Sequence, residues 1–292
     1  HRYTAGTAAE IAHVPSVSIT NLWWTPYDAV GMGLAETHPL FVSVPWLSFV
    51  HSWDWARALG NRLARAMFAR WIKPYNTVRA EYGLRPLASI LDLFGGDAVV
   101  LPDTPELTPA RGLPADYRYV GPLVWEPGGC LPDEVNAIGN YVYVSMGSSA
   151  DPRIFDVAID AVRMLETPAI VTTAGIRKRE EFAGLPDRVR LYDFLPGSAA
   201  ARNASVVVCQ GGIGTIYQAL AAGKPLVGIP FMPEQEVYGI GAVERIGAGI
   251  SVSARGINAA KLAAAIRKVI SRPAYAEAAR GMSASLDLES GP

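Results

Sequence analysis

The stretch SVVVCQGGIGTIYQALAAGKPLVGIP, residues 205–230, decides the fold of this chain. It begins with β-branched residues at 206–208, which are typical of a buried strand. A glycine-dense turn at 211–214 follows, then an alanine-rich helical segment, and then a second apolar run at 226–229. This order of strand, glycine turn, helix and strand predicts one repeat of a parallel α/β sheet.

The same alternation extends through the second half of the chain. We expect strands at 141–144, 169–173, 188–192, 206–209, 226–229 and 249–252. We expect helices at 154–165, 199–203, 215–222, 236–246 and 259–270. The fold class is therefore α/β with a doubly wound parallel sheet, which binds ligands beyond the carboxyl ends of its strands.

The first part of the chain is less regular. We expect a helix at 4–13 and strands at 16–22, 98–101 and 117–120. From the Pro/Gly-rich composition after residue 122 we predict a first domain at 1–124, a linker at 125–138 and a second domain at 139–292. The chain starts at His1 without Met, which we interpret as a missing N-terminal portion rather than a processed or tagged terminus.

The composition narrows the class of protein. Half of the 292 residues are apolar and 18% are charged, as in globular proteins. The formal net charge of −1 does not indicate a nucleic-acid partner. Cys130 and Cys209 are too few for a disulfide framework or a metal-ligand set, and no apolar run reaches about 18 residues. We therefore predict a cytoplasmic protein.

The glycine turn has the chemistry of an anion site. Glycine reaches positive φ and lets a ligand approach the backbone, and the start of the following helix presents unpaired N–H groups. The alternative is a tight turn in which glycine serves packing alone. Other strand ends favour a ligand: Gly147 and Ser148 could bind a second phosphate oxygen, Phe194 could stack on a base, and Glu234 and Gln235 could bind sugar hydroxyls. Together they predict a nucleotide diphosphate sugar.

Two segments resemble the donor-binding signature of the family 1 nucleotide-sugar glycosyltransferases, which include UDP-glycosyltransferase-like and macrolide glycosyltransferase-like members. They are FLP at 194–196 and CQGGIGTIYQALAAGKPLVGIPFMPEQ at 209–235. YVYVSMGSS at 141–149 resembles the first strand and loop of the donor domain, and residues 119–123 resemble the end of the acceptor domain. The resemblance implies the GT-B fold of two facing Rossmann-like domains, with the N-terminal, acceptor-binding domain incomplete.

The resemblance also implies roles for single residues. Phe194 would stack on the nucleobase, and the backbone of Leu195 would pair with its edge. Gly147 and Ser148 would approach the phosphates, and Gln218 stands where the family has a glutamate on the ribose. The remaining donor residues would be Gln210, Gly211, Gly212, Ile213, Gly214 and Thr215 on the diphosphate, and Glu234 and Gln235 on the transferred sugar.

The chain departs from the family pattern at several positions. Gln210 stands where the family has a histidine, and an amide cannot become cationic. Gln218 replaces a carboxylate, and Gly197 stands where plant members have glutamine. None of the four histidines, which are His1, His13, His38 and His51, matches the catalytic base of the family. We therefore assign no catalytic residue.

The reaction implied by the resemblance is inverting sugar transfer from a UDP- or dTDP-sugar. The chain has no Asp-x-Asp pair to hold a metal, and the helix N-terminus after Gly211 could stabilise the leaving diphosphate instead. We expect no metal and no cofactor, because the nucleotide sugar is a substrate.

Aromatic residues in the first domain indicate a lipophilic acceptor. Trp46, Phe49 and Trp53 are the candidates for binding it, although packing of helices against the sheet explains them equally well. A stripe at helical spacing, made of Trp53, Ala56, Leu59, Leu63, Met67 and Trp71, could instead rest on a membrane surface.

Two other interpretations stay open. The chain could be an impaired transferase-like protein that binds a nucleotide or a partner without turnover. Alternatively, Gly212-Ile213-Gly214 could belong to a dinucleotide fingerprint of an NAD-type oxidoreductase, but Tyr217 stands where the third glycine would be.

Overall fold

A computed structural model describes residues 4–31, 33, 35–38, 41, 43–44, 50, 53–124, 128–148 and 150–286. The chain divides into two compact units, from His1 to Leu123 and from Val124 to Leu288. Each unit contains its own parallel sheet. Among the described residues, no helix combines the length and the apolar character needed to cross a bilayer.

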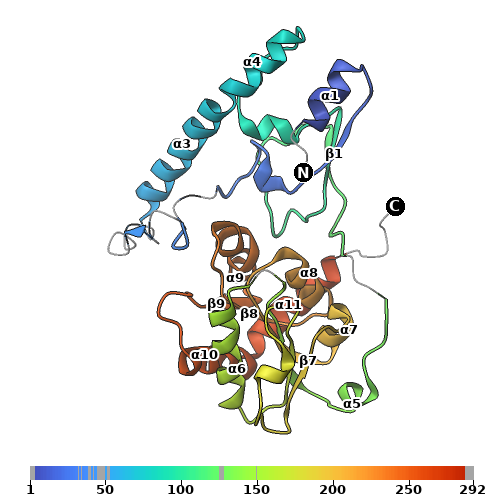
Figure 1. The fold of residues 1–292 in the computed structure, drawn as a ribbon, viewed down its shortest axis with the longest axis vertical. Helices are drawn as coiled ribbons and strands as arrows, with labels where there is room; N and C mark the ends of the chain where they lie inside the picture. Colours follow the sequence, from blue (N-terminus) through green and yellow to red (C-terminus); the bar gives the residue numbers. More distant parts are fainter. Residues whose placement is uncertain are drawn as a thin grey trace. The chain divides into compact units, whose positions relative to one another are not determined.

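The second unit is built on a parallel sheet of six strands in the order β6-β5-β4-β7-β8-β9. Figure 1 labels β7, β8 and β9 of this sheet. Its strands are β4 (Tyr141–Ser145), β5 (Ala169–Thr172), β6 (Val189–Tyr192), β7 (Ala204–Cys209), β8 (Leu226–Gly228) and β9 (Gly249–Ser251). The chain moves outward in one direction from β4 to β6 and then restarts at β7 beside β4. The carboxyl ends of β4 and β7 therefore form the switch point at which such sheets bind ligands.

Helices cover both faces of this sheet. The helices of this unit are α5 (Asp133–Asn136), α6 (Pro152–Arg163), η4 (Arg179–Glu181), α7 (Gly197–Arg202), α8 (Ile213–Ala221), η5 (Gln235–Ile240), α9 (Gly241–Arg245), α10 (Ala259–Ser271) and α11 (Pro273–Ser285). The predicted strands of this unit are confirmed to within about two residues. The prediction of one helix at 236–246 is wrong in detail, because residues 235–240 form a π-helix before α9 begins.

Local sequence explains where the two long helices of the core begin. The Asp151 carboxylate accepts a hydrogen bond from the Arg153 N–H at 2.9 Å, with Pro152 at the first helical position of α6. The Asn258 side chain accepts from the Lys261 N–H at 2.9 Å at the start of α10. Both side chains satisfy N–H groups that the helix itself leaves without a partner.

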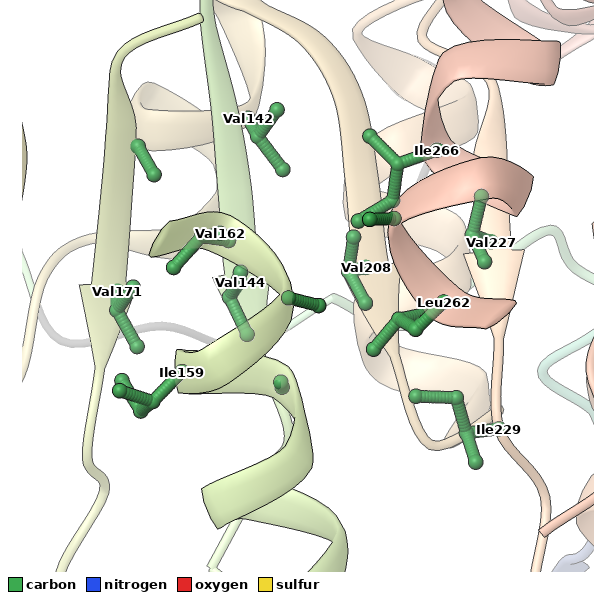
Figure 2. Packing of buried hydrophobic residues seen from close by; sticks show 14 of the residues in the cluster. Val142, Val144, Ile159, Val162, Val171, Val208, Val227, Ile229, Leu262 and Ile266 are labelled. Atoms are coloured by element: carbon green, nitrogen blue, oxygen red, sulfur yellow. The ribbon is translucent and has the colours of Figure 1, made fainter. Parts of the chain in front are cut away.

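The core lies between these helices and one face of the sheet (Figure 2). Val144 of β4 and Val208 of β7 face Ile159 of α6 and Ile266 of α10, and all four are fully buried. The opposite face carries α7 and α8, and the hydroxyl of Tyr141 donates to the Ala200 carbonyl of α7 at 2.7 Å. Alternation along the strands thus supplies both apolar faces of a doubly wound sheet.

The first unit has a smaller parallel sheet in the order β1-β2-β3. Its elements are α1 (Ala5–Ile11), β1 (Val17–Ile19), η1 (Leu22–Trp24), α3 (Asp54–Trp71), α4 (Lys73–Glu81), η3 (Ile90–Phe94), β2 (Ala98–Leu101) and β3 (Tyr117–Tyr119). The strand predicted at 16–22 ends at Ile19. The Asp103 carboxylate accepts from the Leu22 N–H at 3.2 Å, and residues 22–24 turn into a 3₁₀ helix.

Ile266→Ala tests the core of the second unit. We expect it to lower the free energy of unfolding by about 2–5 kcal/mol, because it leaves a cavity between α10 and the sheet. Ile270→Ala is the matched control one turn later in the same helix, where the side chain is 39% exposed. Urea denaturation followed by circular dichroism measures both, and equal losses of stability would contradict this placement of the core.

Candidate functional site

The loops after β4 and β7 meet at the switch point of the second sheet. Gly147 follows β4 with a φ of +69°, and a Cβ at that position would lie 3.2 Å from Nε2 of Gln210. Gln210 directly follows β7 and is 7% exposed. The absence of a side chain at Gly147 therefore lets the amide of Gln210 lie against its backbone.

The Gly211 turn is packed against η5 through backbone atoms. Gly211 has a φ of +95°, and a Cβ there would lie 3.0 Å from the Gln235 carbonyl oxygen. From the other side, a Cβ on Gly239 would lie 2.0 Å from the Gly211 carbonyl oxygen. Both positions therefore require glycine. The backbone of η5 that approaches the Gly211 turn is π-helical.

The start of α8 presents backbone donors to this turn. Gly212 is the N-cap residue, and no side chain caps the helix. The first backbone hydrogen bond of α8 runs from the Ile216 N–H to the Gly212 carbonyl at 3.1 Å, so the N–H groups of residues 212–215 have no acceptor within the helix. The first turn contains no acidic residue, and a Cβ on the exposed Gly214 would meet nothing within 4 Å. This arrangement suits an anion such as a phosphate.

A third close contact joins α8 to the start of α7. A Cβ on Gly197 would lie 2.3 Å from Oε1 of Gln218, so the Gln218 side chain lies across the first residue of α7. Just before it, Leu195 is buried and Phe194 is 57% exposed. Although β6 is an edge strand, the segment that follows it returns toward β4 and β7 because α7 packs on both strands and on α8.

The two residues expected on the sugar follow β8 at the start of η5. Oε1 of Gln235 accepts from the Phe231 N–H at 3.2 Å, and Gln235 is buried. This bond occupies the side-chain oxygen of Gln235 and fixes the side chain beside the loop that follows β8. Glu234 is half-buried and precedes the first residue of η5.

Cys209 is not a nucleophile at this site. Its side chain is fully buried, and burial raises the pKa of the thiol from 9.0 to about 12. Its sulfur accepts from the Gly211 N–H at 3.3 Å. The thiol therefore stays protonated and supports the turn.

The donor residues expected from the sequence all belong to the second unit, in the segments that follow β4, β6, β7 and β8. The close contacts above join Gly147 to Gln210 and Gly211 to Gln235. Gly239 is not among the residues predicted for the site. The only sequence feature that marks it is a glycine in the interior of the helix expected at 236–246.

The acceptor candidates belong to the first unit. Trp46 and Phe49 lie outside the described residues. Trp53 precedes α3, is 45% exposed, and has its ring centroid 5.6 Å from that of Trp55. Of the four histidines, His1 and His51 also lie outside the described residues, and burial lowers the pKa of His38.

The first unit also contains a polar cavity of about 590 Å³. Arg79 lies in its wall and is 3% exposed. The guanidinium donates to Thr7 Oγ1 at 2.9 Å, to the Glu10 carboxylate at 2.8 Å and to the Arg85 carbonyl at 3.0 Å. These bonds tie α1 to α4, so Arg79 has a structural role. Within the described residues, no cluster of three or more His, Cys, Asp or Glu side chains could hold a metal ion.

Residues 157–292 match the family described as "Erythromycin biosynthesis protein CIII-like, C-terminal domain". The chain is 33% identical over 288 residues to a "PGL/p-HBAD biosynthesis glycosyltransferase" of Mycobacterium tuberculosis, covering 96% of this chain and 64% of that protein. It is 32% identical over 291 residues to a "PGL/p-HBAD biosynthesis rhamnosyltransferase" of Mycobacterium bovis, covering 95% of this chain and 60% of that protein. The chain thus spans less than two thirds of the length of these relatives.

Among solved structures, the fold is similar to that of glycosyltransferase VinC in complex with dTDP. The TM-score is 0.68 at 20% sequence identity, and the match covers 98% of this chain and 66% of VinC. This likeness confirms the predicted α/β fold of the GT-B type.

Gly239→Ala tests the backbone contact that holds the Gly211 turn. We expect it to destabilise the chain by about 1–3 kcal/mol, because a methyl group cannot fit against the Gly211 carbonyl without movement of η5. Gly281→Ala is the matched control, since a Cβ there meets nothing within 4 Å and alanine favours the helix α11. Urea denaturation compares the two variants. A neutral Gly239→Ala would show that the approach is looser than described.

The two thiols should differ in reactivity. Cys130 is exposed and Cys209 is buried. We expect one rapidly reacting thiol per folded chain at about pH 8 and two in urea, as measured with a chromogenic disulfide reagent. Burial raises the pKa of Cys209 from 9.0 to about 12 in the folded chain. The protonated thiol therefore makes its full contribution to stability below pH 9.0, and this contribution is lost as the pH rises toward about 12. Rapid reaction of both thiols in the folded chain would contradict the burial of Cys209.

Proposed function

We propose that this chain is a macrolide-type glycosyltransferase of family 1, which binds a nucleoside diphosphate sugar and serves its transfer to a hydroxyl group. The observation that carries this proposal is the uncapped start of α8 at the switch point, beside the Gly211 turn. Backbone donors there would hold the diphosphate in the ground state. They would also stabilise the negative charge that develops on it as the bond to the sugar breaks.

The donor would lie along the carboxyl ends of the strands. The exposed ring of Phe194 would stack on the base, with the Leu195 backbone at the base edge. Gln218, which lies against Gly197 beside this segment, would bind the ribose. Glu234 and the amide nitrogen of Gln235 would bind the sugar hydroxyls. The VinC complex with dTDP supports dTDP as the first nucleotide to test, with UDP as the alternative.

The reaction would be inverting and independent of metal. An acceptor oxygen, deprotonated by a base, attacks the anomeric carbon as the bond to the diphosphate oxygen breaks, and the nucleoside diphosphate leaves with the electron pair. We assign no residue of this chain as the base. The N–H groups at the start of α8 would stabilise the negative charge on the leaving diphosphate, as a bound metal ion does in other enzymes.

The acceptor would be a lipophilic small molecule or a lipid. Two relatives named for PGL/p-HBAD biosynthesis and the aromatic residues Trp46, Phe49 and Trp53 support this class. We place the reaction in the cytoplasm, where both cysteines would stay reduced, with peripheral contact to a membrane.

Binding without turnover is the second candidate function. Gln210 and Gln218 are neutral at positions where the resemblance calls for a histidine and a carboxylate. Incubation of the chain with dTDP- or UDP-sugars and lipophilic alcohols, with release of nucleoside diphosphate as the readout, separates the two. Release that depends on the acceptor supports transfer, whereas nucleotide binding without release supports the second candidate.

Phe194→Ala and Gln210→Ala test the donor site. Each should weaken dTDP or UDP binding by about 1–3 kcal/mol in calorimetry, through lost stacking and through a lost hydrogen bond. Tyr82→Ala is the control for Phe194, because Tyr82 is an equally exposed aromatic residue of the first unit, at 58%. Unchanged affinity in both site variants would refute the proposed donor site.

Gln210→Glu separates a phosphate contact from a general packing role. A carboxylate beside the diphosphate should weaken binding more than Gln210→Ala does, because like charges repel at short range. The additional loss should shrink at high salt. Equal affinities of the two variants would place the diphosphate away from Gln210.

Binding of NAD⁺ in preference to dTDP and UDP would favour the oxidoreductase alternative.

A further inference from the structure

Helix α3 of the first unit has two apolar stripes that differ in exposure. The inner stripe repeats every four residues and is buried or half-buried: Ala56, Gly60, Ala64 and Phe68. The outer stripe is offset by one residue and is exposed: Trp55 61%, Leu59 46%, Leu63 61%, Met67 39% and Trp71 54%. Residues four apart are neighbours on a helix surface, so each stripe forms a continuous row that turns by about 40° at each step along α3. The inner stripe accounts for the packing of α3, whereas the outer stripe stays exposed apart from the ring contacts of Trp55 with Trp53 and of Trp71 with Phe68.

The exposed side of α3 is also basic. The helix contains four arginines, which are Arg57, Arg62, Arg65 and Arg70, and a single acidic residue, Asp54. Arg62 and Arg70 lie on the row next to the outer stripe. In the part of the chain that the structure describes, none of these arginines forms a salt bridge. The helix therefore carries a local excess of three positive charges on a chain with a formal net charge of −1.

This combination selects among the partners that could cover the outer stripe. A second copy of the chain would bring the arginines of two helices together, and like charges disfavour such an interface. A neutral apolar partner would leave the arginines without counter-charges. An anionic bilayer surface satisfies both features, because Trp and Leu side chains enter the boundary between headgroups and acyl chains while arginines bind lipid phosphates.

We propose that α3 lies along the surface of an anionic lipid bilayer, with Trp55, Leu59 and Leu63 inserted and Arg62 and Arg70 on lipid phosphates. The inference deepens the proposed function, because a lipophilic acceptor would be drawn from the same surface, and it rests on that function for this link alone. The docking itself needs no sugar transfer.

Flotation of the full chain with lipid vesicles tests the proposal. Vesicles of phosphatidylcholine with phosphatidylglycerol should bind the chain, pure phosphatidylcholine vesicles should bind it far less, and salt should weaken binding to the mixed vesicles. Leu59→Ser with Leu63→Ser should lower the partition coefficient at least about tenfold. Arg62→Glu with Arg70→Glu should lower it at least about 25-fold, at roughly fivefold for each lost cation.

The second unit supplies matched controls. Met164→Ser removes an apolar side chain that is 48% exposed, and Lys268→Glu reverses an exposed charge, so both should bind vesicles as the unchanged chain does. Unchanged circular dichroism and dTDP affinity in the α3 variants show that a loss of vesicle binding is local and independent of the donor site. Failure of dTDP binding in every variant and in the unchanged chain would instead count against the proposed function.

Three results would overturn the proposal. One is equal binding to neutral and anionic vesicles. Another is vesicle binding that survives both pairs of α3 substitutions. The third is a dimer in sedimentation velocity that Leu59→Ser with Leu63→Ser dissociates, because the outer stripe would then cover a second copy of the chain.

Discussion

The approach of Gly239 to the Gly211 carbonyl is the constraint on which the proposed donor site depends. A Cβ on Gly239 would lie 2.0 Å from that oxygen, so η5 and the turn after β7 contact each other through backbone atoms alone. The turn leads directly into α8, and its path sets where the first N–H groups of that helix point. A helix dipole is useful to a ligand only when its end is held in place, and here the backbone contact holds it.

The side chains that pack against the glycines of this site are uncharged amides. Gln210 rests on Gly147, Gln218 rests on Gly197, and Gln235 lies against Gly211. Three amides thus occupy places beside glycines, and the first turn of α8 contains no acidic residue. An anion bound there would be held by backbone N–H groups and amide donors rather than by an ionisable partner. These amide and backbone groups keep the same charge across the pH range near neutrality, because amides do not titrate.

The two units have different roles in the function we propose. The second unit has a large core, and its helices α6 and α10 close one face of the sheet (Figure 2). The first unit has a small core around Leu22, Val99 and Leu101 and presents a basic helix with an exposed apolar stripe. Burial of apolar area in the second unit makes a rigid support for phosphate binding, whereas apolar area left exposed in the first unit is available to a lipid surface.

The amino-acid sequence by itself determined the α/β class, the alternation of the second sheet and the resemblance to family 1 glycosyltransferases. These properties follow from local patterns: β-branched runs, helical spacing and a glycine turn between them. Only the tertiary structure decided that 235–240 is π-helical, that Gly239 fits against Gly211, and that Gln218 lies across Gly197. The last two are contacts between residues distant in the chain, and the π-helix accompanies the first of them. Which residues meet depends on the surfaces that the sheet brings together, and no local pattern encodes that pairing.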